Sequence, residues 1–186
     1  MKIRTLHNQT NQLITEAIQQ KREAQKELFE LYSPKMLGVC RQYVKDVHHA
    51  EELMLSGFLK VFTHISKFKN EGSFEGWIRR IMVNTCISYL RKKNPVQLSD
   101  EDFVFNDQAT QSLESTEVED IQKMIDCLPV GYKMVFNLYA IEGYKHTEIA
   151  KELGITVSTS KSQLFKARKW LQVQYLKRNE LVHGDK

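Results

Sequence analysis

The spacing of apolar residues predicts a helical protein. From about residue 10 to residue 93, apolar positions recur every three or four residues, as they do on the buried face of a helix. One helix includes Leu28 to Val44, with a kink or break expected at Ser33-Pro34, and a second carries an apolar stripe from Ala50 to Phe62. A third begins near Ser73, a good N-cap residue, and stops before Asn94-Pro95. These helices predict one small domain at residues 10–93.

The periodic pattern stops after residue 93 and resumes near residue 117. Residues 94–116 are acidic, rich in Ser, Asp and Gln, and predict a linker. The apolar residues Phe103, Val104 and Phe105 within it leave a docking segment as the alternative. Helices are then predicted at 118–128, 131–141, 146–153 and 157–177, which form a second small domain at residues 117–178. With no strand pattern in the sequence, the predicted fold class is all-α, with two helical domains joined by an acidic linker.

Residues His146 to Leu171 have the spacing of a helix-turn-helix. Ala150 is small where two helices must approach, Gly154 suits a turn that needs a positive φ, and Ile155 is expected in the core. The second helix of the motif is predicted to bury Ser160, Leu164, Ala167 and Leu171. Its other face carries hydroxyls, lysines and a lone aromatic, which can enter a major groove. A structural hairpin with a merely solvated face is the alternative.

Charge is distributed unevenly along the 186 residues, although the net charge is only +4. Residues 67–93 hold seven basic and two acidic side chains, residues 99–126 hold one basic and nine acidic ones, and residues 145–178 hold eight basic and two acidic ones. Two basic blocks on different helices suggest two separate contacts with a polyanion such as duplex DNA.

Several classes of protein are excluded by what the sequence lacks. The longest strongly apolar stretch, Met134 to Ile141, is too short to span a membrane, and the polar N-terminus does not resemble a signal peptide, so we expect a cytoplasmic protein. Cys40, Cys86 and Cys127 lie far apart in apolar helical patterns, which favours buried reduced thiols over a disulfide framework or a metal site. The sequence has no Gly-rich phosphate loop and no His-Glu-x-x-His motif, so we expect neither an enzyme nor a cofactor.

Two stretches resemble a known family. The run HHAEELMLSGFLKVFTHISKFKNEGSFEGWIRRIMVNTCISYLRKK looks like the domain of bacterial sigma factors that binds core RNA polymerase and reads the minus-10 element, and the C-terminal helix-turn-helix looks like their minus-35-reading domain. With only these two domains, the chain resembles an extracytoplasmic-function (ECF) sigma factor, and GSFEGWIRRIMVNT is similar to members from Bacteroidetes. The resemblance implies a monomeric initiation factor whose partners are core RNA polymerase and promoter DNA, with an anti-sigma factor as a candidate third partner.

The same resemblance implies roles for particular residues. The helix from Ala50 to Phe62 would bind the polymerase, and the loop from Lys67 to Gly76 with Asn84 would hold a base flipped out of the non-template strand. The implied polymerase-binding residues are Glu51, Glu52, Leu55, Ser56, Phe58 and Leu59. The implied minus-10 residues are Lys67, Lys69, Arg79, Arg80, Asn84, Arg91 and Lys92. The implied minus-35 residues are Ser158, Thr159, Lys161, Ser162, Phe165, Lys166 and Lys169.

The predicted linker is long enough to join two DNA contacts. The 23 residues from 94 to 116 reach at most ~75 Å, which is enough for the roughly 50–70 Å that one and a half to two turns of DNA span. Leu55 and Ser56 stand where the family usually has Gln and an acidic residue, and Val157-Ser158 stands where Glu-Gly is common.

The competing interpretation is a stand-alone helix-turn-helix regulator, which would bind a palindromic site without polymerase.

Overall fold

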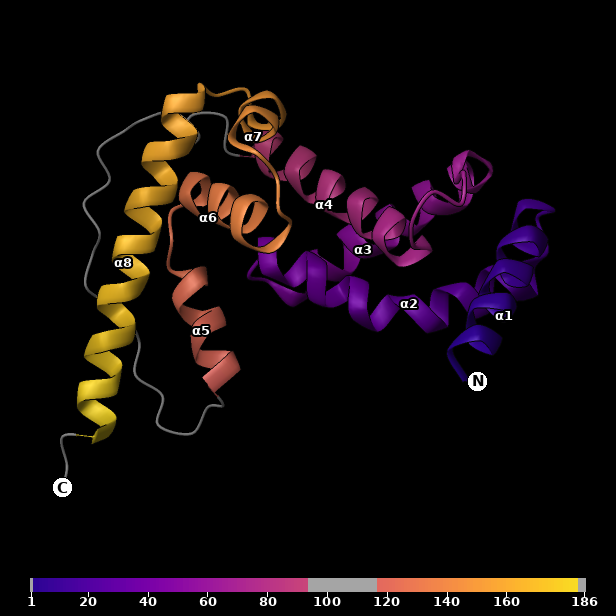
Figure 1. Ribbon diagram of the computed structural model, residues 1–186, viewed down its shortest axis with the longest axis horizontal. Helices are drawn as coiled ribbons and strands as arrows, with labels where there is room; N and C mark the ends of the chain where they lie inside the picture. The colour runs from indigo at the N-terminus through magenta and orange to yellow at the C-terminus, as the bar shows by residue number, and fades with distance from the viewer. Residues whose placement is uncertain (1, 94–116, 184–186) are drawn as a thin grey trace. The chain divides into compact units, whose positions relative to one another are not determined.

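The computed structural model describes residues 2–93 and 117–183, and every regular element in these ranges is a helix (Figure 1). The all-α fold class is therefore confirmed. The predicted linker, including Phe103, Val104 and Phe105, lies outside the described residues. The elements are α1 (Lys2–Ile18), α2 (Arg22–Tyr43), α3 (Val47–His64), η1 (Ile65–Lys67), α4 (Phe74–Lys93), α5 (Glu117–Asp126), α6 (Val130–Phe136), η2 (Asn137–Ile141), α7 (His146–Leu153) and α8 (Val157–His183).

The chain divides into two compact units, residues 1–86 and residues 87–186. The division falls inside α4, so it does not coincide with either end of the expected linker. The domain bounds drawn from the sequence, 10–93 and 117–178, stay a prediction.

The core of the first unit is formed where α2 packs against α1 and α3 and where α3 meets α4. Leu28 and Met36 of α2 and Ile78 and Met82 of α4 are almost completely buried. A glycine permits the approach of α3 to α4, because a Cβ on Gly57 would stand 2.2 Å from the Met82 sulfur. That distance is well inside van der Waals contact, so the packing of these helices requires the missing side chain.

Helix α2 runs unbroken through Pro34, where the sequence predicted a kink or a break. A proline inside a helix removes one hydrogen bond and costs ~3 kcal/mol. The two turns around it are held by tertiary packing, since Tyr32 and Met36 are both buried. Burial on either side of Pro34 therefore offsets the local cost, and of the two predicted outcomes the break does not occur.

The start of α4 follows the local rules. The Ser73 Oγ accepts a hydrogen bond from the Gly76 amide at 3.0 Å, which confirms Ser73 as the N-cap. The preceding loop turns through left-handed backbone at Asn70 (φ 58°) and Gly72 (φ 93°). A salt bridge of 2.8 Å between Lys35 Nζ and Glu75 Oε2 joins the first turn of α4 to α2.

The second unit packs α5, α6 and α7 along α8 (Figure 1). Met124, Leu128 and Tyr132 form a buried cluster with Ala167 and Trp170 of α8. Beside it, Lys133 Nζ lies 2.5 Å from Asp126 Oδ1, and both side chains are buried. Removing one member of such a pair costs about 3–5 kcal/mol, because the other charge is left buried without its partner.

The turn of the predicted helix-turn-helix has the expected geometry. Gly154 has φ 68°, and its amide donates to the Ala150 carbonyl after α7 ends at Leu153. Left-handed backbone at this place favours glycine. The helix predicted over residues 131–141 ends as a π-helical segment, η2, in which Asn137 is fully buried.

The cysteines meet the prediction only in part. Cys40 and Cys86 are buried free thiols, as predicted. Cys127 is exposed and directly follows the last residue of α5, so the expectation that it would be buried is wrong. Within the described ranges, no helix combines the length and apolar character that crossing a bilayer requires.

Candidate nucleic-acid interface

The first candidate surface combines the loop before α4 with the solvent-facing side of α4. Lys67, Lys69 and Arg80 are exposed, and Arg79 is half-buried. Asn84 is exposed between the buried residues Val83 and Thr85. Arg91 and Lys92, in the last turn of α4, are also exposed. All seven residues predicted from the sequence are thus at least partly accessible, and cations here can reach backbone phosphates.

An aromatic cluster supports this loop. The Phe74 ring lies parallel to Trp77 at 5.7 Å, and Phe68 contacts both rings at 5.1 and 5.6 Å. Trp77 is half-buried, so part of its side chain remains accessible. The sequence placed Trp77 on the buried face only, so its accessible part was missed. Flat rings of this kind can stack with unpaired bases.

The exposed side of α3 forms a second surface. Glu51, Glu52 and Ser56 are exposed, and the apolar residues Leu55 and Leu59 are 54% and 69% exposed. Phe58 is an exception among the predicted polymerase-binding residues. It is only 3% exposed, and its ring contacts Phe29 of α2 at 4.8 Å. Phe58 therefore belongs to the buried apolar stripe of α3, because the helical repeat turns it away from Leu55 and Leu59, and its contact with polymerase stays a prediction.

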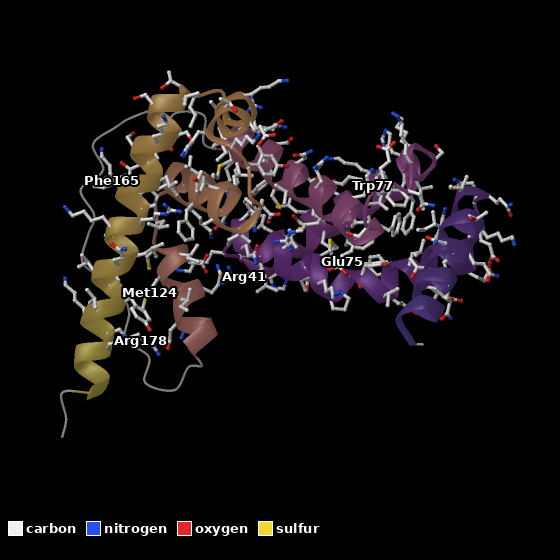
Figure 2. All side chains as sticks on the ribbon, in the orientation of Figure 1. Arg41, Glu75, Trp77, Met124, Phe165 and Arg178 are labelled. Carbon is white, nitrogen blue, oxygen red and sulfur yellow. The ribbon has the colours of Figure 1, made fainter. Side chains whose placement is uncertain are left out.

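The third surface lies on α8. Ser158, Lys161 and Lys169 are exposed, and Phe165 is 68% exposed and projects from the outer side of the helix (Figure 2). Ser162 and Lys166 are half-buried. The buried positions Ser160, Leu164 and Ala167 confirm the predicted inner face.

Thr159 lies on the inner side of α8, so the prediction that it projects from the outer face is wrong, and its role in DNA binding stays a prediction. It is 8% exposed, and its hydroxyl lies 2.8 Å from that of Thr156. The buried stripe is wider than the sequence indicated, because Gln163, Trp170 and Gln174 are buried as well. Along the helix, the intervals from Thr159 to Gln163, from Gln163 to Trp170 and from Trp170 to Gln174 are four, seven and four residues. These intervals place all four residues on the same side of the helix.

A polar network joins α7 to α8 below the outer face. The Nδ1 of His146 lies 2.9 Å from the Ser160 hydroxyl, and the His146 ring stacks on Tyr139 at 4.6 Å. The guanidinium group of Arg168 lies over the Tyr139 ring, with its carbon 5.2 Å from the ring centroid. Arg168 was missed in the sequence, although it lies seven residues after Lys161 and therefore on the same helix face.

The same network determines the protonation of His146. Burial lowers the pKa of the imidazole below its ordinary value, and the nearby cations Lys161 and Arg168 lower it further. The neutral ring is therefore favoured in the folded unit. In the part of the chain that the structure describes, no three His, Cys, Asp or Glu side chains gather as metal ligands would.

Comparison with known families assigns both halves of the chain. Residues 28–96 match the family model "Sigma-70 region 2", and residues 118–171 match "Sigma-70, region 4". Together these stretches cover more than half of the chain. The first contains α3, the loop and α4, and the second contains the helix-turn-helix.

Several known sigma factors match most of this chain. The chain is 27% identical to the RNA polymerase sigma-H factor of Pseudomonas aeruginosa over 181 residues, covering 88% of this chain and 92% of the relative. It is 28% identical to the ECF RNA polymerase sigma factor SigW of Bacillus subtilis over 164 residues, or 80% and 87% of the two chains. The solved structure of the sigma factor RpoE in complex with the anti-sigma factor NepR from Bartonella quintana has a similar fold, with a TM-score of 0.51, 22% identity and coverage of 82% and 96%. Because models of both sigma-70 regions match the chain and these relatives match it over most of their length, the chain belongs to the sigma-70 family as an ECF sigma factor, an initiation factor that binds RNA polymerase and directs it to promoters.

Proposed function

We propose that the loop and α4 read the minus-10 element as single-stranded DNA. The loop before α4, with Asn84, holds one extruded base, and the partly accessible Trp77 stacks beside it. Lys67, Lys69, Arg79 and Arg80 contact the phosphates on either side. Arg91 and Lys92 contact phosphates further along the strand. This proposal is supported by the coincidence of exposed cations, an exposed amide and an aromatic cluster on one short stretch of chain.

The outer face of α8 reads the minus-35 element in the major groove. Lys161 lies in the second turn from the helix N-terminus and contacts a base edge, and Phe165 contacts an apolar group such as a thymine methyl. Ser158, Ser162, Lys166 and Lys169 contact phosphates, and Arg168 joins them. The observation that carries the proposal is that basic, exposed faces lie on two separate helices, one in each matched region.

The exposed side of α3 binds core RNA polymerase. Leu55 and Leu59 lie one turn apart and provide exposed apolar area, with Glu51, Glu52 and Ser56 around them. A central apolar contact surrounded by polar groups is typical of protein interfaces. The acidic linker joins the two DNA-reading regions, and the protein acts as a monomer in the cytoplasm. By analogy with the RpoE–NepR complex, an anti-sigma factor is a further partner.

Transcription with purified core polymerase tests these assignments. The protein should direct initiation from a subset of a random promoter library, whereas the protein without polymerase should bind duplex DNA weakly and with a steep salt dependence. Asn84→Ala should reduce open-complex formation more than initial promoter binding. Ser88→Ala, which changes an exposed polar residue one turn further along α4, serves as the matched control. Equal losses in both variants, or a lower Tm in Asn84→Ala alone, would contradict the base-binding role.

A further inference from the structure

The ring of Tyr139 joins the support of the helix-turn-helix to the outer face of α8. The guanidinium carbon of Arg168 lies over this ring, 5.2 Å from its centroid. A cation within about 6 Å of an aromatic centroid is attracted by the negative face of the ring. Arg168 is exposed, and it lies three residues after Phe165 and seven after Lys161, so it shares their side of the helix. Tyr139 is therefore in contact with a cation on the face that we propose meets DNA.

The backbone that carries Tyr139 is fixed by the core of the second unit. The two residues before it, Asn137 and Leu138, are fully buried, whereas Tyr139 itself is half-buried. The π-helical turn η2 closes where the Glu142 amide donates to the Asn137 carbonyl at 3.0 Å. Turns of this kind are rare, and they occur frequently at functional sites. The ring therefore projects from an unusual turn whose first two side chains are held in the core.

His146 holds the Tyr139 ring from a second element. The two rings stack with their centroids 4.6 Å apart and their planes inclined by 26°. The Nδ1 of His146 lies 2.9 Å from the hydroxyl of Ser160, a fully buried residue of α8. Because His146 is joined to the inner side of α8 in this way, the ring stacked on it keeps a fixed position relative to that helix.

We propose that Tyr139 is a positioning residue for DNA binding, which holds the guanidinium of Arg168 where it meets a backbone phosphate of the minus-35 element. This inference rests on the proposed role of the outer face of α8. A long exposed side chain samples many rotamers, and fixing it on binding costs conformational entropy. Contact with a fixed ring removes part of this cost before DNA arrives. The attraction needs no hydrogen bond, so the guanidinium N–H groups can donate to phosphate oxygens.

A positioning role for Tyr139 has a consequence that a direct contact with DNA does not share. A phosphate carries no sequence information, so the ring should affect affinity for all minus-35 sequences alike. Its effect should also pass through Arg168, and so it should disappear when that side chain is removed. A tyrosine that touched DNA itself, or that only supported the fold, would act whether or not Arg168 were present. The dependence of one residue on the other therefore separates the two roles.

Side-chain order in the wild-type chain gives the first test. Nuclear magnetic relaxation of the arginine Nε atoms, measured on the full-length protein without DNA, should show Arg168 to be ordered on the picosecond to nanosecond timescale. Arg80, an exposed arginine of α4, should be mobile. Tyr139→Phe keeps the ring and should preserve the order of Arg168, whereas Tyr139→Leu should abolish it. An Arg168 side chain as mobile as Arg80 in the wild type would overturn the proposal, whatever the stability of the variants.

Binding of the holoenzyme to a promoter duplex gives the second test. Tyr139→Leu should weaken the initial complex by about two- to fivefold, the loss expected for an exposed cation–π contact. In the Arg168→Ala background the same change should weaken it by less than about 1.5-fold, because the partner is already missing. Tyr139→Phe should bind as the wild type does. Tyr175→Leu makes the same change at a tyrosine that is 47% exposed further along α8, and as the matched control it should have no effect in either background.

The binding data can overturn the proposal in three ways that are told apart. Equal weakening by Tyr139→Leu in both backgrounds would show that the ring acts without Arg168. Unchanged binding of Tyr139→Leu, while Arg168→Ala weakens binding and lowers the salt dependence by about one ion, would keep the phosphate contact and remove Tyr139 from it. If Arg168→Ala changed neither affinity nor salt dependence, the proposed phosphate contact itself would fail, and the positioning role would fail with it.

Discussion

Gly57 of α3 faces the sulfur of Met82 so closely that the two helices have no room for a single additional carbon atom. A Cβ on Gly57 would stand 2.2 Å from Met82 Sδ and 2.9 Å from its methyl carbon. Met82 is fully buried, so its flexible side chain has no open space to move into. The surface of α3 proposed to bind polymerase and the surface of α4 proposed to read DNA are therefore held together by this contact.

Gly57→Ala should destabilise the first unit. Overpacking of a filled core costs typically about 1–3 kcal/mol, and urea unfolding should show this loss. Gly57→Ala/Met82→Ala should lose less free energy of unfolding than the sum of the two single variants, because the shortened side chain makes room for the added methyl group. Additive losses would show that the helices move apart instead.

Phe58 and Leu59 should separate folding from polymerase binding, because one is buried and its neighbour is 69% exposed. Phe58→Ala should cost about 3–5 kcal/mol of stability. Leu59→Ala should change stability by less than about 0.5 kcal/mol and weaken binding to core polymerase in a competition assay. Leu59→Ala protein that competes as well as the wild type would remove this part of α3 from the interface.

The pKa of His146 predicts how the second unit responds to acid. The folded-state pKa lies below the ordinary value of 6.5, so the unfolded chain takes up the proton more readily. The stability that depends on neutral His146 is therefore fully present above pH 6.5 and declines as the pH falls from 6.5 towards the folded-state pKa. Melting temperatures of the wild type and His146→Gln, measured from pH 7.5 to 5, should converge at low pH. His48→Gln, at a side chain that is 90% exposed, should keep the pH dependence of the wild type.

The outer face of α8 should divide into residues that read sequence and residues that only bind phosphate. Lys161→Ala should change base preference at one position of a randomised minus-35 library, by ~1–3 kcal/mol if the lysine contacts guanine. Lys166→Ala should weaken binding to all sequences alike and reduce the salt dependence by about one ion. Lys177→Ala, an exposed lysine further along α8, is the matched control and should change neither property. Identical preference profiles for Lys161→Ala and the control would show that this face does not read bases.

Arg168 provides a check on the network that supports α8. Arg168→Lys keeps the charge and loses the planar contact with the Tyr139 ring. We expect reduced affinity for promoter DNA with unchanged base preference, because the residue contributes a positioned charge rather than a base contact. An altered preference would instead make Arg168 a base-reading residue.

Local patterns in the sequence determined most of the helices and the family. Apolar spacing located the helical segments, Ser73 marked the start of α4, and Gly154 marked the turn of the helix-turn-helix, since capping and left-handed backbone depend on one residue and its close neighbours. The two motifs, in their order along the chain, were enough to indicate the sigma factor family.

Tertiary structure decided the features that depend on residues distant in the sequence. Pro34 stays helical because neighbouring helices bury the residues around it, and Thr159 is buried because Gln163, Trp170 and Gln174 widen the inner face of α8. The approach of Gly57 to Met82 and the stack of His146 on Tyr139 each join two separate elements. A periodic pattern indicates which side of a helix is buried, but the width of the buried stripe and the partner of each side chain follow only from the way the helices pack.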